Sequence, residues 1–254
     1  MRSYLEYINQ LGRLQKKSAH RPLQAGFTIT EVLLASLMML IVISVAGIGV
    51  TNLLRSNYRA NAGTEIQNNL NRTLEFVSDE VRRASIIADS EATAAAFESG
   101  QVPEEARTEG ARVVLVFQIS DPNNPGQAPL NEQIVYYTKG PENSLTGPRV
   151  LWRYGPNLDA NGNYITPADV ATWISSPVTD RLAAPAPAPD GICPEDFNLI
   201  AVNPNPVVDG FYACVRAGGN QVILNANAEV NLTTGDTDKV DYSVSTRVSP
   251  RAAN

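Results

Sequence analysis

Side chains that commonly act as nucleophiles, bases or metal ligands are scarce in this chain of 254 residues. It has a single histidine, His20, and two cysteines, Cys193 and Cys214. A Ser–His–Asp triad, a Cys–His dyad and a Cys/His zinc site each need a histidine, so none of them is available beyond the first 26 residues. The sequence also has no P-loop, no G-x-S-x-G motif and no glycine-rich dinucleotide fingerprint. We therefore expect no enzymatic activity and no cofactor.

Two acidic stretches have the general character of calcium loops. Residues 159–163, DANGN, begin such a loop, but Tyr164 stands where it needs glycine and Val170 where it needs a final acid. The second stretch contains Asp236, Asp238 and Asp241. A solvated turn is the ordinary interpretation of both stretches, and we expect no bound metal.

Glu31 is the acidic residue with the most unusual surroundings. It lies in the segment FTITEVLLASLMMLIVISVAGIGV, residues 27–50, whose last nineteen residues, from Val32 onward, carry no charge. As a helix with a rise of about 1.5 Å per residue, this segment extends roughly 36 Å, enough to cross a hydrocarbon layer of about 30 Å. A carboxylate inside such a layer is costly, and it usually has a function and a partner.

The charges on either side of this segment indicate its orientation. Residues 1–26 carry a net charge of +4, which leaves −10 on the other 228 residues, since the whole chain carries −6. By the positive-inside rule, the basic leader stays in the cytoplasm and the C-terminal body is exported. A body this acidic does not favour nucleic acid or anionic lipid as a partner.

Three other interpretations of the apolar segment are open at this point. A secretory signal peptide would be cleaved after Ser44-Val45-Ala46, although its apolar core is usually about 7–15 residues long. A simple signal anchor would give Glu31 no role. A buried core helix fits least well, because no charge interrupts residues 32–50 on any face.

The residues around Glu31 resemble the N-terminus of type IV prepilins and type II secretion pseudopilins. The matching features are a basic leader that ends in Gly26, then Phe27, then Glu31 four residues later, and a hydrophobic helix. The resemblance implies that a membrane-embedded prepilin peptidase cuts between Gly26 and Phe27 and methylates the new amino terminus. It also implies that Glu31 serves in assembly, by pairing with the free ammonium of Phe27 in a neighbouring subunit.

Beyond the apolar segment, the sequence predicts a long helix. Apolar side chains recur at spacings of three and four at Ile66, Leu70, Leu74, Val77, Val81 and Ala84. This stripe is typical of a helix that packs on a sheet, and charged residues such as Glu75, Asp79 and Glu80 are expected largely away from it. Because no proline occurs between Gly26 and Pro103, one helix from 27 to 88 is allowed, with Gly47 and Gly49 as its weak points.

The rest of the chain predicts a β-rich head. Short stretches rich in Val, Ile and Tyr predict strands at 112–119, 133–138, 149–154, 197–203, 210–216, 221–225 and 239–248. Turn-rich insertions are expected at 123–130 and 156–167, an acidic connection at 89–110, and an exposed polyproline-like link at 183–189.

The predicted fold is therefore α+β, and the resemblance implies a pilin-like arrangement of a long helix packed on an antiparallel head. The predicted parts are a basic leader (1–26), a transmembrane and filament-core helix (27–50), an amphipathic helix (51–88) and a periplasmic head (89–254).

Cys193 and Cys214 have 20 residues between them. Outside the cytoplasm we expect such a pair to form a disulfide, and two buried thiols are the alternative. In pilins a disulfide near the C-terminus often fixes an exposed loop, and the resemblance implies the same role here. No C-x-x-C motif is present to indicate redox catalysis.

Together with the resemblance, these features predict a structural minor pilin or pseudopilin. It would cross the inner membrane once, with a periplasmic head, and then join a type IV pilus or a type II secretion pseudopilus. The implied partners are the prepilin peptidase, other pilin or pseudopilin subunits and the inner membrane, with no nucleic acid. The alternative is a membrane-tethered or pilus-tip adhesin, in which Trp152 and Trp173 would contact sugars.

Overall fold

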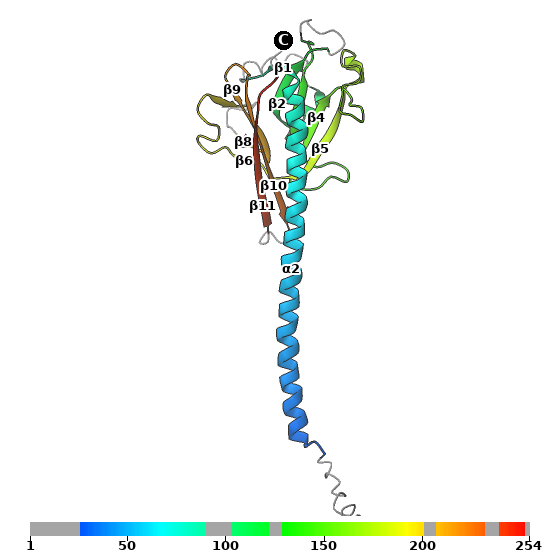
Figure 1. Cartoon of the computed structure of the whole chain (residues 1–254), viewed down its shortest axis with the longest axis vertical. Coiled ribbons are helices and arrows are strands. Elements are labelled where there is room, and N and C mark those ends of the chain that lie inside the picture. The colour runs from blue at the N-terminus through cyan, green and yellow to red at the C-terminus, as the bar shows by residue number, and fades with distance from the viewer. Residues whose placement is uncertain (1–25, 90–102, 122–128, 201–206, 232–238, 252–254) are drawn as a thin grey trace, which may run out of the picture. The chain divides into compact units, whose positions relative to one another are not determined.

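The computed structural model of the protein describes residues 26–89, 103–121, 129–200, 207–231 and 239–251. The chain divides into two units, residues 1–55 and 56–254, which are described separately. One long helix, α2 (Ile29–Arg82), is followed by an antiparallel sheet (Figure 1). The fold is therefore α+β, as the sequence predicts. The predicted leader lies outside the described residues up to position 25.

In the first unit, α2 continues through Gly47 and Gly49 without a break. Its apolar side chains from Val32 to Leu54 are exposed. Within the described part of the chain, α2 is the helix long and apolar enough to cross a membrane, judged by length and composition. The expected weakness at the two glycines is thus not accompanied by a break in the helix.

The second unit is built on a nine-stranded sheet. Its strands are β1 (Ala84–Ile87), β2 (Arg112–Ile119), β3 (Ile134–Lys139), β4 (Arg149–Gly155), β5 (Ile174–Leu182), β7 (Phe197–Leu199), β9 (Phe211–Arg216), β10 (Val222–Asn231) and β11 (Lys239–Val248). Their order is β1-β2-β3-β4-β5-β10-β9-β7, and β11 pairs with β10. Two short strands, β6 (Ala186–Pro187) and β8 (Val207–Val208), pair with each other. The 3-10 helices η2 (Glu104–Arg107) and η3 (Val170–Thr172) lie in the connections.

The core of this unit forms where α2 covers one face of the sheet. The predicted stripe is buried: Ile66, Leu70, Leu74, Val77 and Val81 are each at most 3% exposed. They belong to one apolar cluster with side chains of the sheet such as Leu115, Phe117, Tyr136 and Leu224. The prediction that the stripe packs on a sheet is therefore confirmed.

The edge strand β11 alternates as predicted, with Val240, Tyr242, Val244 and Thr246 half-buried and the residues between them exposed. All ten of its residues pair with β10 without a register shift. Gly63 of α2 lies against this strand, and a side chain there would collide with the hydroxyl of Tyr242. The glycine weakens the helix locally, but it permits this close approach.

The helix ends at Arg82, six residues before the predicted boundary at 88. The Arg83 backbone N–H bonds to the Glu80 carbonyl at 2.9 Å, which closes the last turn. Residues 84–87 then form β1, paired with β2. Pairing with β2 and burial of Ala84 and Ile87 at the sheet thus outweigh continuation of the helix.

The strand predictions are accurate at 112–119 and 239–248 and shifted by one or two residues at β3, β4 and β9. β10 extends to Asn231, six residues beyond the prediction, because it pairs with all of β11. The predicted strand 197–203 ends at Leu199 as β7, and 201–203 lie outside the described residues. β5 was not predicted at all.

The predicted connections are only partly described. The link at 183–189 is largely exposed, as expected, but two of its residues form β6. Residues 156–167 form a turn-rich segment with an isolated bridge between Leu158 and Tyr164. Most of the expected loop 123–130, and residues 90–102 of the acidic connection, fall outside the described ranges.

Candidate functional site at the start of helix α2

Gly26 and Phe27 lie just before α2 and are exposed, with the Phe27 side chain at 80%. Apart from its chain neighbours, no atom of the described residues would lie within 4 Å of a methyl group added at Gly26, and its backbone does not have the positive φ that favours glycine. Folding therefore does not require a glycine at position 26.

Thr28 caps the first turn of α2. Its carbonyl oxygen accepts the backbone N–H groups of Glu31 at 3.0 Å and Val32 at 3.2 Å, and its Oγ1 accepts that of Glu31 at 3.3 Å. Thr28 and Glu31 thus have the T-x-x-E spacing of a capping box, in which a threonine hydroxyl satisfies the third helical N–H. Local chain chemistry therefore fixes where the helix begins and places Glu31 in its first turn.

The Glu31 side chain is exposed, and no hydrogen bond or ion pair to its carboxylate is formed within the described part of the chain. An acid in the first turn gains roughly 0.3–1 kcal/mol from the helix dipole. In a hydrocarbon environment that gain does not replace a cationic partner. The described part of the chain therefore gives the Glu31 carboxylate no cationic partner.

The few hydroxyl groups in the apolar segment are satisfied by the helix itself. Ser36 donates to the Leu33 carbonyl and Ser44 to the Leu40 carbonyl, both at 2.8 Å, and Thr51 donates to the Gly47 carbonyl at 3.1 Å. In lipid, where no water is available, each unsatisfied hydroxyl would be costly. The segment is thus suited to hydrocarbon apart from Glu31.

In the head, Glu80 of α2 and Arg153 of β4 form a buried ion pair. Their side chains are 3% and 4% exposed, and two guanidinium nitrogens, Nε and Nη2, each donate to a carboxylate oxygen at 2.7 Å. Tyr136 also donates its hydroxyl to Glu80, and Arg153 donates to the Pro156 carbonyl at 2.9 Å. This cluster fixes the helix to the sheet.

Burial and the nearby Glu80 carboxylate raise the pKa of Tyr136 well above its ordinary value, so its hydroxyl stays protonated and donates. Burial alone would lower the pKa of Arg153, but the hydrogen bonds and charge of Glu80 raise it overall. The expectation that Glu80 lies away from the apolar stripe was wrong. Its position three residues after Val77 and one before Val81 is the signal that it shares the buried face.

A second buried ion cluster surrounds Asp209, which is 3% exposed. Its carboxylate lies 3.2 Å from Arg112 Nε and 3.4 Å from Arg149 Nε, and it accepts the hydroxyl of Thr138. These three partners belong to β2, β4 and β3, whereas Asp209 directly precedes the β9 hairpin. Asp209 thus connects strands β2, β3 and β4 with the segment that leads into β9. No sequence motif marks this residue.

Of the two suspected calcium loops, the structure fully describes the one at residues 159–163. The Asp159 Oδ1 accepts the backbone N–H groups of Asn161 and Asn163, both at 2.8 Å, which makes this stretch an Asx-type turn. The Asn163 hydrogen bonds lower the pKa of Asp159. Asp241 lies on β11, whereas Asp236 and Asp238 lie outside the described residues. No metal-ligand cluster occurs among the positions that the structure describes.

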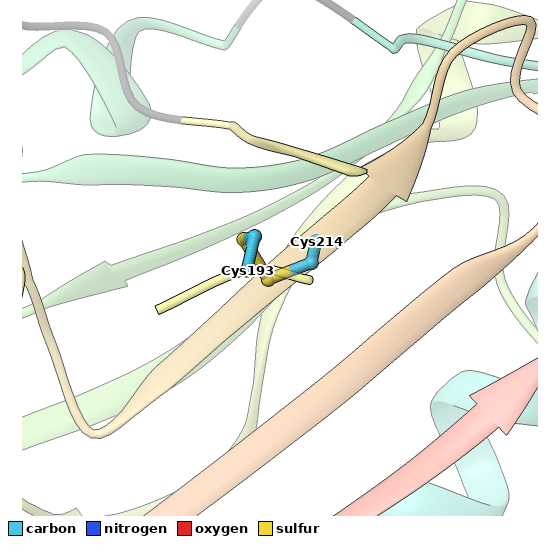
Figure 2. The surroundings of a disulfide bond; sticks show 2 residues. All are labelled: Cys193 and Cys214. Atoms are coloured by element: carbon cyan, nitrogen blue, oxygen red, sulfur yellow. A yellow bond between two sulfur atoms is a disulfide. The ribbon is translucent and has the colours of Figure 1, made fainter. Parts of the chain in front are cut away.

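The predicted disulfide between Cys193 and Cys214 is present. Figure 2 shows Cys214 on strand β9 and Cys193 on a separate segment beside it. Cys214 is fully buried and Cys193 is half-buried. The bridge therefore fastens the exposed stretch before β7 to an inner strand of the sheet.

Removing the disulfide is expected to destabilise the head by about 3 kcal/mol, because it closes a loop of 21 residues. Urea unfolding of the oxidised full-length protein in detergent, compared with the same protein under reducing conditions, measures the change. Hydrogen exchange should accelerate in residues 190–200 more than in α2. A Cys193→Ala/Cys214→Ala variant provides an independent comparison, and equal stability of the oxidised and reduced forms would contradict this role.

The tryptophans considered for sugar contact are both in the interior. Trp152 is 8% exposed and Trp173 is 6% exposed. The Trp173 indole donates to the Pro167 carbonyl at 3.1 Å, and Lys139 Nζ lies 4.4 Å from the Trp152 ring centre. These aromatic rings therefore support the head rather than present a flat sugar-binding surface.

Comparison with known proteins finds no matching family model, no matching curated protein and no matching solved structure. Any proposal about function therefore depends on the chain's own chemistry: an apolar helix, a capped start, an acid without a partner among the described residues and a glycine against which these residues do not pack.

Proposed function

We propose that this protein is a non-enzymatic structural subunit of the pilin type, a minor pilin or a pseudopilin. It is inserted once in the inner membrane with its head in the periplasm. Prepilin peptidase cuts it between Gly26 and Phe27, and its apolar helix then joins other subunits in a type IV pilus or a type II secretion pseudopilus.

The observation that carries this proposal is the Glu31 carboxylate, which has no partner among the described residues and lies in the first turn of an exposed apolar helix. A single-pass anchor has no use for such a group, whereas an assembling helix can use it to set register. The new ammonium of Phe27 on a neighbouring subunit is a suitable cation, because a charged pair in a dry environment compensates the burial of both groups.

The capped helix start adds support, since it places Glu31 close to the N-terminus that cleavage would create. The head supports a minor role rather than a repeating one, because it is large and carries long connections between its strands. Its buried tryptophans and its lack of a histidine agree with a structural subunit.

Cleavage is expected to leave Phe27 as the first residue, with a methylated amine. N-terminal mass spectrometry of the protein from its native membrane measures this directly. Gly26→Leu should leave the precursor uncut, because a Cβ at position 26 contacts none of the described residues and the peptidase would be the part that rejects the larger side chain. Ser44→Leu is the matched control and should be processed normally, whereas a mature chain that begins at Gly47 would establish ordinary signal-peptide cleavage instead.

A further inference from the structure

Strand β5 has an open edge inside the head. It pairs with β4 along one side, from Ile174 to Leu182. On its other side it meets β10 at a single point, where Leu182 pairs with Ala228. No other described strand pairs with that side, so the backbone from 174 to 181 presents an edge of the kind that can receive another strand. Pro177, which cannot donate a ladder hydrogen bond, is typical of such an edge.

A groove of about 760 Å³ lies between β5 and α2, with Arg153 of β4 also in its lining. Five consecutive residues, 176–180, form one wall, and they amount to roughly 16 Å of extended chain at about 3.3 Å per residue. The opposite wall is one face of α2, with Asn69, Arg72, Thr73 and Phe76 at helical spacing. The groove is thus as long as a short strand and has a strand edge as one wall.

The side chains in the groove favour an amphipathic occupant. Apolar contact is available from Phe76 and Val178, which are half-buried, and from Ile174, which is 49% exposed. Asn69 contributes a side-chain amide to the groove, whereas the Asn157 amide nitrogen already donates to the Thr172 carbonyl at 3.3 Å. An unpaired strand edge with both apolar and polar side chains nearby is an arrangement that can bind extended peptides.

Some of the charged side chains that line the groove already have partners within the head. Arg153 is held by Glu80, and Asp180 Oδ2 accepts both the backbone N–H and the hydroxyl of Thr146, at 3.1 and 2.8 Å. Arg72 is exposed and has no ion-pair partner within the described ranges. Asp180 keeps its negative charge, because both donors from Thr146 are neutral. On the α2 wall, Arg72 presents a positive charge to a ligand, and an acidic side chain complements it there.

We propose that the β5 edge binds an extended peptide segment of a partner protein, which adds a strand to β5 and places an acidic side chain against Arg72. Main-chain hydrogen bonds would supply most of the affinity, and the contacts with Phe76, Val178 and Arg72 would supply selectivity. This proposal does not depend on filament assembly, because the groove belongs to the head alone.

The test selects ligands for the full-length protein in detergent from a displayed library of random peptides about ten residues long. Enriched peptides should carry an acidic residue and alternating apolar residues. Arg72→Glu should weaken their binding about tenfold or more, and so should N-methylation of alternate peptide bonds, which blocks strand pairing. Arg247→Glu, an exposed change on β11, is the matched control and should leave affinity within about twofold.

Failure to enrich any peptide would overturn the proposal, and so would peptides that are indifferent to both Arg72→Glu and N-methylation. Size-exclusion chromatography tests a different occupant. If the full-length protein self-associates and Arg72→Glu abolishes that association, the groove binds a second copy and the peptide proposal is wrong. Tryptophan fluorescence of each variant verifies that the head is still folded.

Discussion

Replacing Glu31 by alanine is expected to produce a protein that is inserted and cleaved normally but is absent from filaments. The change lengthens the apolar run, so insertion should survive or improve. The Gly26–Phe27 junction is untouched, so cleavage should also survive. Assembly loses the carboxylate that would pair with the ammonium of a neighbouring Phe27. Mature protein should accumulate in the inner-membrane fraction, measured by immunoblots of membrane and sheared filament material.

Glu31→Gln distinguishes the charge of Glu31 from its contribution to the helix cap, both of which Glu31→Ala removes. Glutamine at the third helical position still suits a capping box beside Thr28, but it carries no charge. If assembly needs the charge, Glu31→Gln fails as completely as Glu31→Ala. If glutamine restores incorporation, helix capping was the role and the charge pairing is wrong. Thr28→Val is the complementary control: it loses a cap worth about 1 kcal/mol and should still assemble, because Glu31 remains.

Glu80→Ala is expected to destabilise the head by about 3–5 kcal/mol, because it leaves the buried Arg153 guanidinium without its counter-charge. It also removes the acceptor of the Tyr136 hydroxyl. Urea unfolding of the full-length protein in detergent, followed by the fluorescence of Trp152 and Trp173, measures the loss.

The neighbouring residue provides a matched control. Asp79→Ala removes an exposed ion pair with Arg82 on the same helix and should cost less than about 1 kcal/mol. A double variant, Glu80→Met/Arg153→Met, should recover part of the stability, since apolar side chains can replace a buried ion pair but leave the Tyr136 hydroxyl without its acceptor. Equal effects of Glu80→Ala and Asp79→Ala would be evidence against a buried pair that holds the helix to the sheet.

Elements with a strong periodic pattern could be predicted closely from the sequence. The stripe from Ile66 to Val81 and the alternation of β11 both follow from burial on one face, and burial is what a periodic pattern records. The end of α2 was harder, because residues 84–87 suit either a helix or a strand locally. Pairing with β2, distant in sequence, decides between them.

β5 escaped prediction for a related reason. Its sequence, ISSPVTDRL, is polar and contains Pro177, and its burial does not alternate clearly. Such a segment becomes a strand because it pairs with β4. The sequence of the segment alone does not show this pairing. The same applies to the groove, whose walls come from residues about a hundred positions apart in the chain.

The residues of the candidate site, in contrast to β5 and the groove, could be selected from the sequence. Gly26, Phe27, Glu31 and the two cysteines could all be selected from residue type and spacing, because each is unusual where it stands. The structure adds the cap at Thr28 and the free space around Gly26. The buried clusters around Glu80 and Asp209 could not be predicted in this way, because ordinary charged residues on the surface have the same local sequence.

The direct junction between α2 and β1 has a mechanical consequence. Only Arg83 lies between the last helical residue and the first residue of β1. Tension transmitted along the helix would therefore enter the sheet without passing through a compliant linker. The contacts from Ile66 to Val81 extend over about four helical turns, so they would share the load before it reached the β1–β2 hydrogen bonds. The head would then resist detachment as one stiff body.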